Sequence, residues 1–231
     1  LQINTACCPH FLQTNIPVPY VSRVLGVNKI GACNFVDSII HYFILISMLG
    51  ISSIGIREIA KNKRNHNELS NTFNNLFWLT GLCTLIATLI LLIFIYSIPQ
   101  LYAHKNLMLI GGLKLISNFL LIEWLFKGLE DFKYITQRTL IVKCIYVICV
   151  FCFVREQADY PIYYLLLTLM ISLNALCNCM YARKYVRIKR PKAIFKYMKP
   201  FAIMGLYAIL TLLLVASKKF RPAPLPSTPS L

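Results

Sequence analysis

The sequence predicts an all-α fold, a polytopic transmembrane helix bundle of about six to seven spans. Of its 231 residues, 58% are hydrophobic and only 14% are charged, whereas soluble domains carry roughly 25% charged residues. The apolar residues form continuous blocks of about twenty residues, and a helix of that length crosses about 30 Å of hydrocarbon. Because the blocks are continuous rather than alternating, and a lone helix satisfies its own backbone in lipid, helices are expected rather than a β-barrel.

Six apolar blocks are predicted to span the membrane, in the order 30–54, 73–97, 107–126, 139–154, 161–182 and 201–216. Each is long enough to cross at 1.5 Å per residue, the shorter ones with help from flanking residues. Residues 11–22 are a candidate for part of a further, earlier span, but this segment is short and contains two prolines.

Lysine and arginine residues are unevenly distributed over the gaps between these blocks. Residues 57–64, 127–138 and 183–199 are rich in them, whereas residues 98–106 and 155–160 contain one each. Rich and poor gaps alternate, and the positive-inside rule places the rich ones in the cytoplasm. The net charge of +16 is therefore that of a membrane protein, and no nucleic-acid partner is expected.

The nine cysteines lie mostly inside apolar blocks, where free Cys behaves as a small hydrophobe. Cys149 and Cys152 form a C-x-x-C pair, but no second pair or His cluster accompanies it. We therefore expect no metal and no cofactor. The sequence also has no Walker motif, so ATP hydrolysis is not expected and the chain is not predicted to be an enzyme.

Two charges are predicted to lie at membrane depth, where a charge costs about 2.5–3.5 kcal/mol. Lys114 and Asp37 each lie about seven residues in from the outer end of their spans, and so at similar depth. We expect the two side chains to face one shared cavity in the outer leaflet, where they could form an ion pair. The alternative is a buried ion pair with a structural role and no cavity. Snorkelling of Lys114 to the outer surface is the alternative. At helical spacing Lys114 shares a face with Ser117 and Asn118. Asp37 shares a face with Asn34, Ser38 and His41.

Further polar residues lie near the inner end of the predicted bundle. Glu123 and Lys127 are four residues apart in the favourable order, which predicts an ion pair at the inner surface. Asn174 and Asn178 fall on one face of the block 161–182. They are expected either to line a cavity or to hydrogen-bond between helices.

Four motifs are similar to those of a known family: "PYVSRVLG" (19–26), "SIGIREIAK" (53–61), "IEWLFKGLEDFKYITQR" (122–138) and "ARKYVRIK" (182–189). Through them the chain resembles the bacterial polysaccharide-repeat flippases, which are O-antigen type polysaccharide biosynthesis proteins. This family belongs to the multidrug/oligosaccharidyl-lipid/polysaccharide exporter superfamily. The resemblance covers residues 19 to about 216.

The resemblance implies a flippase in the bacterial cytoplasmic (inner) membrane. Such proteins carry undecaprenyl-pyrophosphate-linked oligosaccharide repeat units across that membrane for surface polysaccharide biosynthesis. They are expected to use alternating access between two six-helix lobes, coupled to H⁺ or Na⁺. The expected partners are thus the lipid-linked oligosaccharide and membrane lipids.

The chain is about half as long as the resemblance implies, so we expect a truncated protein with one lobe and the first helix of a second. The expected divisions are an irregular N-terminal segment (1–18), the transmembrane bundle (19–182), a basic cytoplasmic linker (183–200), that first helix (201–216) and a disordered Pro-rich tail (217–231).

A diphosphate that crosses hydrocarbon needs cations in a wet cavity to replace its water. The candidates are Arg23, Arg57 and Lys114, although interfacial anchoring would also account for the two arginines. The candidates for ion coupling or for polar positions in the cavity are Asp37, His41, Asn118, Asn174 and Asn178. Two other functions stay open: a small-molecule or drug antiporter of the same superfamily, and a non-functional membrane fragment.

Overall fold

The computed structural model describes residues 18–48, 50–186 and 203, and within these residues the fold is all-α, as predicted. The helices in chain order are α2 (Val18–Ser47), α3 (Ile51–Asn62), α4 (His66–Ser97), α5 (Pro99–Tyr102), α6 (Lys105–Leu120), α7 (Glu123–Gly128), α8 (Phe132–Phe153), the 3₁₀ turn η1 (Gln157–Asp159) and α9 (Tyr160–Ala182).

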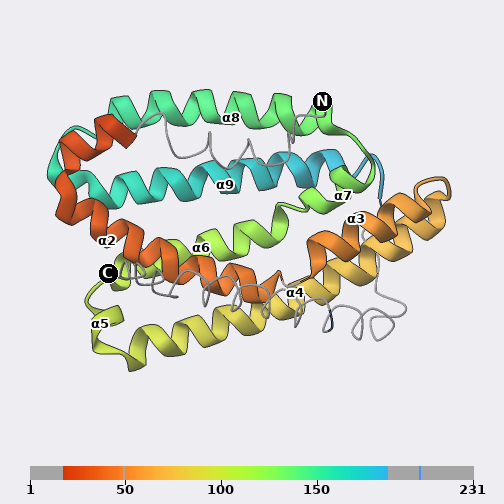
Figure 1. The fold of residues 1–231 in the computed structure, drawn as a ribbon, viewed down its shortest axis with the longest axis horizontal. Coiled ribbons are helices and arrows are strands. Elements are labelled where there is room, and N and C mark those ends of the chain that lie inside the picture. Colours follow the sequence, from red (N-terminus) through yellow and green to blue (C-terminus); the bar gives the residue numbers. More distant parts are fainter. Residues whose placement is uncertain (1–17, 49, 187–202, 204–231) are drawn as a thin grey trace, which may run out of the picture.

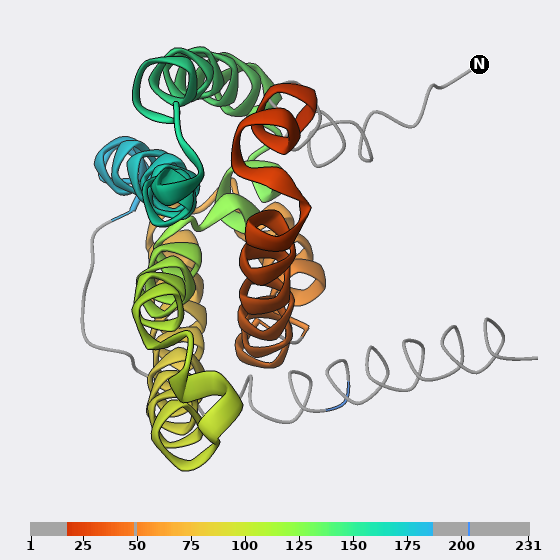
Figure 2. The ribbon, with the colours of Figure 1, turned by 90° about the vertical axis from the view of Figure 1, so that its left-hand side faces the viewer.

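The long helices lie side by side along one axis (Figure 1). The α3–α4 connection, α7 and the C-terminal end of α9 meet at one end of the bundle, and α5 and η1 lie at the other. The first of these ends carries the basic gaps, so the positive-inside rule predicts that it faces the cytoplasm, and we call it the cytoplasmic end. Seen along the axis, α8, α9, α6 and α4 follow one another around one side, and α2 and α3 lie on the other (Figure 2).

Five stretches of the described chain are long and apolar enough to cross a membrane: Tyr20–Ser47, His66–Ser97, Lys105–Gly128, Phe132–Phe153 and Gln157–Ala182. They correspond to the first five predicted blocks. The sixth block apart from residue 203, most of the basic linker, the tail and residues 1–17 lie outside the described residues.

The ends of the predicted blocks differ from those of the helices at several points. The first block, 30–54, is divided because Gly50 adopts a left-handed φ of 76° and separates α2 from α3. The predicted turn 127–138 is shorter than expected because Asp131 caps α8, which already begins at Phe132. The Asp131 carboxylate accepts a hydrogen bond from the backbone N–H of Tyr134 at 3.4 Å.

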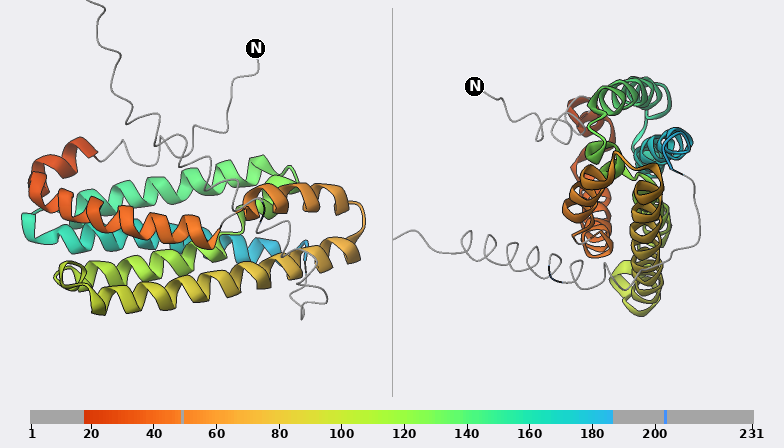
Figure 3. Two further views of the ribbon diagram at one scale, coloured as in Figure 1. Left: turned by 60° about the horizontal axis from the view of Figure 1, so that its bottom comes forward. Right: turned by 90° about the vertical axis from the view of Figure 1, so that its right-hand side faces the viewer.

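The helix α2 consists of two helical segments that meet at a sharp bend at Gly26, whose φ is 73° (Figure 3). A positive φ is strained for residues with a Cβ, so glycine suits this position. In the segment before the bend, Val21 and Leu25 belong to one buried apolar cluster with side chains of α8, and the Tyr20 ring lies 4.6 Å from that of Phe151. The segment after the bend runs toward α3 (Figure 3).

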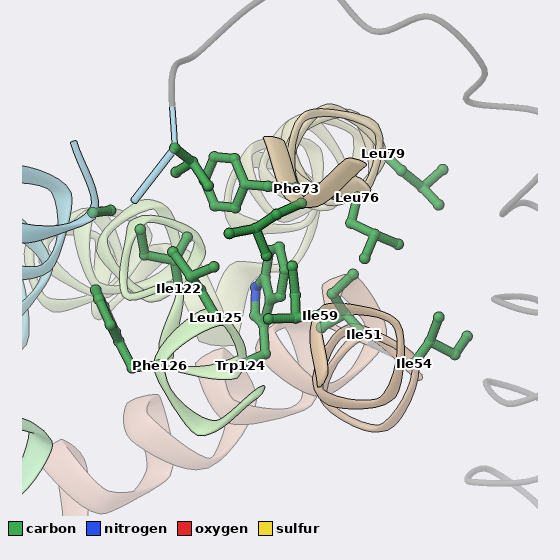
Figure 4. Close-up of a cluster of buried hydrophobic side chains, with 13 residues drawn as sticks. Ile51, Ile54, Ile59, Phe73, Leu76, Leu79, Ile122, Trp124, Leu125 and Phe126 are labelled. Carbon is green, nitrogen blue, oxygen red and sulfur yellow. The ribbon is translucent and has the colours of Figure 1, made fainter. Parts of the chain in front are cut away.

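An aromatic core closes the cytoplasmic end of the bundle, where α3, α4 and α7 meet (Figure 4). The Trp124 ring of α7 stacks on Phe73 of α4 with 5.5 Å between ring centroids. A Cβ at Gly55 of α3 would lie 2.7 Å from the Trp124 ring, and a Cβ at Gly128 would lie 2.7 Å from Ile59. Glycine at these two positions thus lets α3 and α7 pack closely.

Candidate functional site

An ion pair between Lys114 of α6 and Asp37 of α2 joins these two helices, and it confirms the predicted pairing of the two residues. The Lys114 side chain is 14% exposed and the Asp37 side chain is 41% exposed. Lys114 therefore points into the protein rather than snorkelling to the surface. The buried Tyr164 hydroxyl on α9 donates a second hydrogen bond to the Asp37 carboxylate at 3.4 Å.

Close helix packing around Gly111 positions this ion pair. Gly111 lies one turn before Lys114, and a Cβ on it would be 2.5 Å from Ile40 Cγ1 and 3.1 Å from the Tyr164 hydroxyl oxygen. The missing side chain thus lets α6 approach α2 and α9 at once. The three polar groups at the pair come from these three helices.

The polar contacts continue along α6 toward the cytoplasmic end. The hydroxyls of Ser117 on α6 and Ser172 on α9 are 2.7 Å apart, and the Ser172 hydroxyl also donates to the Thr168 carbonyl at 3.0 Å. Asn118, the next polar residue on this face, lines an open pocket of about 210 Å³ at the cytoplasmic end. The pocket is lined by Met48, Ser52, Asn118, Leu121, Ile122, Glu123, Trp124 and Lys127.

The α2 residues that share a face with Asp37 form an exposed polar stripe. Asn34, Ser38 and His41 are all exposed, and they recur at the three- and four-residue spacing of one helix face. The Ser38 hydroxyl donates to the Asn34 carbonyl at 2.8 Å. Because polar groups are costly in hydrocarbon, such a stripe needs water or further protein beside it.

A three-residue ion cluster lies at the cytoplasmic end and includes the predicted pair of Glu123 and Lys127. Lys127 Nζ is 3.0 Å from Glu123 Oε2, and Arg138 Nη2 is 3.3 Å from Glu123 Oε1. Sequence reasoning missed Arg138 because it was counted with the charges of a cytoplasmic gap. It lies in the second turn of α8, whose start the sequence did not reveal, and its side chain is only 5% exposed.

The two candidate arginines do not join Lys114. Arg23 is exposed on the part of α2 before the Gly26 bend, at the outer end of the bundle. Arg57 lies on α3 at the cytoplasmic end, and its side chain is 85% exposed and 3.8 Å from Glu58. The three candidate cations are therefore spread along the bundle instead of forming one cluster.

The two candidate asparagines of α9 make different contacts. The Asn178 side-chain amide donates to the Leu121 carbonyl, which lies at the break between α6 and α7. The Asn174 amide donates to the Met170 carbonyl of its own helix at 2.9 Å. Asn178 thus makes the interhelical contact that the sequence left open, whereas the Asn174 amide donates within its own helix.

Within the described ranges, no group of three His, Cys, Asp or Glu side chains could hold a metal ion. The polar groups that the bundle does bring together are suited to binding an anion or exchanging a proton. A lysine, a carboxylate and a tyrosine meet at the Asp37 pair, and two further cations flank Glu123.

Comparison with known proteins gives the family. A family model described as "Polysaccharide biosynthesis protein" matches residues 12–216. The chain belongs to this family. The match includes all four motifs from which the resemblance was inferred, and it extends that resemblance toward the N-terminus.

A curated relative from Escherichia coli (strain K12) bears the name "Putative O-antigen transporter". It is 24% identical over 157 residues, which cover 66% of this chain and 37% of the relative. The chain therefore matches little more than a third of that protein. No solved structure matches the chain. The relative and the five span-capable helices identify a multi-pass protein of the bacterial inner membrane.

Proposed function

We propose that this chain forms the N-terminal lobe of a flippase that moves undecaprenyl-pyrophosphate-linked oligosaccharide across the inner membrane, without any enzymatic step. The Lys114–Asp37 ion pair between two span-capable helices carries this proposal. Ionisable residues in transmembrane helices are costly and commonly belong to substrate or ion pathways. The family and the name of the relative supply the class of substrate.

In this mechanism Lys114 and Asp37 form an exchangeable pair. When the lipid diphosphate reaches the pair, the Lys114 ammonium contacts a phosphate oxygen and Asp37 loses its cationic partner. A proton or Na⁺ then neutralises Asp37, and the Tyr164 hydroxyl keeps the carboxyl group in place. The exchange at the pair thereby links occupancy by substrate to occupancy by the coupling ion, and each ligand shifts the conformational equilibrium by its difference in affinity between the two states.

The positions of Arg23 and Arg57 suggest separate steps for the two arginines. Arg57 is exposed at the cytoplasmic end and Arg23 at the outer end. We assign Arg57 to uptake of the diphosphate from the inner leaflet and Arg23 to its release on the outer side. The polar stripe of α2 lies between these ends and would face the water-filled path, with His41 and Asn118 as polar contacts for the sugar or the ion.

The test uses a full-length version of the protein in cells whose surface glycan depends on it. Replacement of Arg57 or Lys114 by Ala should reduce glycan export at least about tenfold, the effect of losing roughly 1.4 kcal/mol of interaction with the diphosphate. Lys61→Ala is the matched control, because Lys61 is an exposed lysine on the same helix as Arg57. Membrane insertion should be normal in all three variants, and normal export in both test variants would contradict the proposal.

The same cells also test the two alternatives, a drug antiporter and a non-functional membrane fragment. Drug efflux without any change in surface glycan would indicate an antiporter. The pairing of Asp37 with Lys114 speaks against it, because a free acid is better suited than an ion pair to bind a cationic drug. If the full-length protein supports neither glycan export nor drug efflux, the reading of the chain as part of a transporter is wrong.

A further inference from the structure

Arg138 is an unusual arginine because much of its hydrogen-bonding capacity is buried and unused. Its side chain is 5% exposed, and it lies more than one turn inside α8. Nη2 has two hydrogen-bond partners, the Glu123 carboxylate at 3.3 Å and the Thr139 hydroxyl at 3.2 Å. In the described part of the chain, Nε and Nη1 are buried and have no partner.

The unused atoms Nε and Nη1 are donors that favour an anion. A guanidinium carries five N–H donors and no acceptor, and it stays charged at any physiological pH. Buried donors without partners are destabilising. The planar fork of arginine matches the oxygens of phosphate groups better than any other side chain does.

Glu123 already occupies the place that a phosphate would take. One carboxylate oxygen contacts Lys127 and the other contacts Arg138, so a single anion bridges two cations. Two positive charges face one negative charge, which leaves the cluster with a net charge of +1. Glu123 and Lys127 also line the open cytoplasmic pocket, whereas Arg138 lies behind Glu123, so a ligand in that pocket contacts Lys127 at once and Arg138 only by displacing Glu123.

We propose that Lys127 and Arg138 form a binding site for the diphosphate head of a prenyl-linked lipid at the cytoplasmic end, and that Glu123 is an internal anion which the diphosphate displaces. This proposal rests on the proposed function and adds to it a loading site distinct from the Lys114–Asp37 pair. While the site is empty, the Glu123 carboxylate stays between Lys127 and Arg138. This pairing limits the cost of holding two cations near the membrane.

A purely structural ion cluster would behave differently. If Glu123 only ties α7 to α8, its neutralisation removes an attraction and creates no binding capacity. If Glu123 competes with a ligand, its neutralisation frees two cations and tightens binding. Glu123→Gln has nearly the same size as the native side chain and therefore separates these two cases.

The experiment measures binding of farnesyl diphosphate and of inorganic pyrophosphate to the purified 231-residue chain in detergent micelles, by calorimetry. In Glu123→Gln we expect the Kd for both ligands to fall about tenfold, equivalent to the loss of one competing ion pair. In Arg138→Gln we expect the Kd to rise at least about tenfold. Arg138→Lys keeps the charge without the fork and should lie between Arg138→Gln and the native chain.

The matched control is Glu130→Gln. Glu130 pairs with Lys63 at 3.1 Å at the same end of the bundle, and both side chains are more exposed than Arg138. This variant should bind as the native chain does. Circular dichroism and thermal unfolding of every variant show whether it is folded, and a larger upward shift of Tm by ligand in Glu123→Gln than in the native chain gives a second measure of binding.

Unchanged or weaker binding in folded Glu123→Gln, native binding in folded Arg138→Gln, or no binding in any variant would overturn the proposal. Binding of pyrophosphate but not of farnesyl diphosphate would overturn the assignment to a lipid. Glycan export that depends on Lys114 together with diphosphate binding that ignores Glu123 would refute this site and leave the proposed function standing. Diphosphate binding that depends on Glu123 and Arg138, together with normal export by Lys114→Ala, would refute the exchange at Lys114 and leave this site standing.

Discussion

Gly111 determines how closely α6 approaches the helices that carry Asp37 and Tyr164. Because a Cβ there would be 2.5 Å from Ile40 Cγ1, alanine forces α6 away from α2. We expect Gly111→Ala to lower the free energy of unfolding by about 1–3 kcal/mol, the usual cost of overpacking. Thermal unfolding of the purified chain in detergent would measure this loss.

Gly112 is the matched control for this substitution. It is the next residue of α6, and a Cβ there would meet only Leu91 Cδ2, at an ordinary contact distance of 3.9 Å. Alanine is also the better helix former. Gly112→Ala should therefore be neutral or slightly stabilising, and an equal loss in both variants would show that close packing at Gly111 is not what holds the site.

At the residue scale, the sequence predicted the Lys114–Asp37 pair because depth along a helix can be counted from its ends. The Glu123–Lys127 pair followed from spacing alone. Arg138 could not be assigned in this way, because its burial depends on where α8 begins. That boundary is set by the Asp131 cap, which looks like any other acid in a charged stretch.

At the element scale, the break between α6 and α7 shapes the cytoplasmic pocket. Ile122 adopts a left-handed conformation with φ 35° and ψ 33°, which is uncommon for a β-branched residue. The break takes the Leu121 carbonyl out of the helix ladder, and the Asn178 amide of α9 donates a hydrogen bond to it. The strained turn is thus held by a contact from another helix.

Asn178→Ala should weaken this turn, because it leaves the Leu121 carbonyl without the Asn178 donor. The expected loss in the free energy of unfolding is about 1–3 kcal/mol, measured by thermal unfolding in detergent. Asn174→Ala is the control on the same face of α9. Its amide donates to Met170 of its own helix, so a smaller loss is expected, and a larger loss for Asn174→Ala would contradict the role given to Asn178.

The breaks between elements were predictable only where the sequence contains a residue that favours them. Gly26 and Gly50 both adopt positive φ at a bend or a helix end, and glycine is the residue that does so without strain. The break at Ile122 lies in the run "LLIE", which contains no glycine or proline. The block 107–126 was therefore predicted as one uninterrupted span, and only packing against α9 reveals the turn.

At the scale of the whole molecule, the all-α membrane fold follows from the apolar blocks, since their length and continuity leave few other arrangements. The arrangement of the helices around the Asp37 pair does not follow from them. It depends on close contacts between residues far apart in the sequence, such as Gly111 with Ile40 and with Tyr164. These contacts involve side-chain shape, which hydropathy does not encode.

The polar stripe of α2 gives a test of the whole arrangement in the membrane. If the stripe faces a water-filled path, Ser38→Cys should react with a membrane-impermeant, water-soluble thiol reagent, because only the hydrated thiolate reacts readily. Leu85→Cys is the control, since Leu85 is 60% exposed on the apolar helix α4 and should face lipid. Both variants are made in the full-length protein after its native cysteines have been replaced, and labelling is measured in intact cells.

Added lipid-linked substrate should slow labelling at Ser38→Cys, because the oligosaccharide would fill the path. Equal labelling at the two positions would place the stripe against lipid and remove the basis for a cavity beside Asp37.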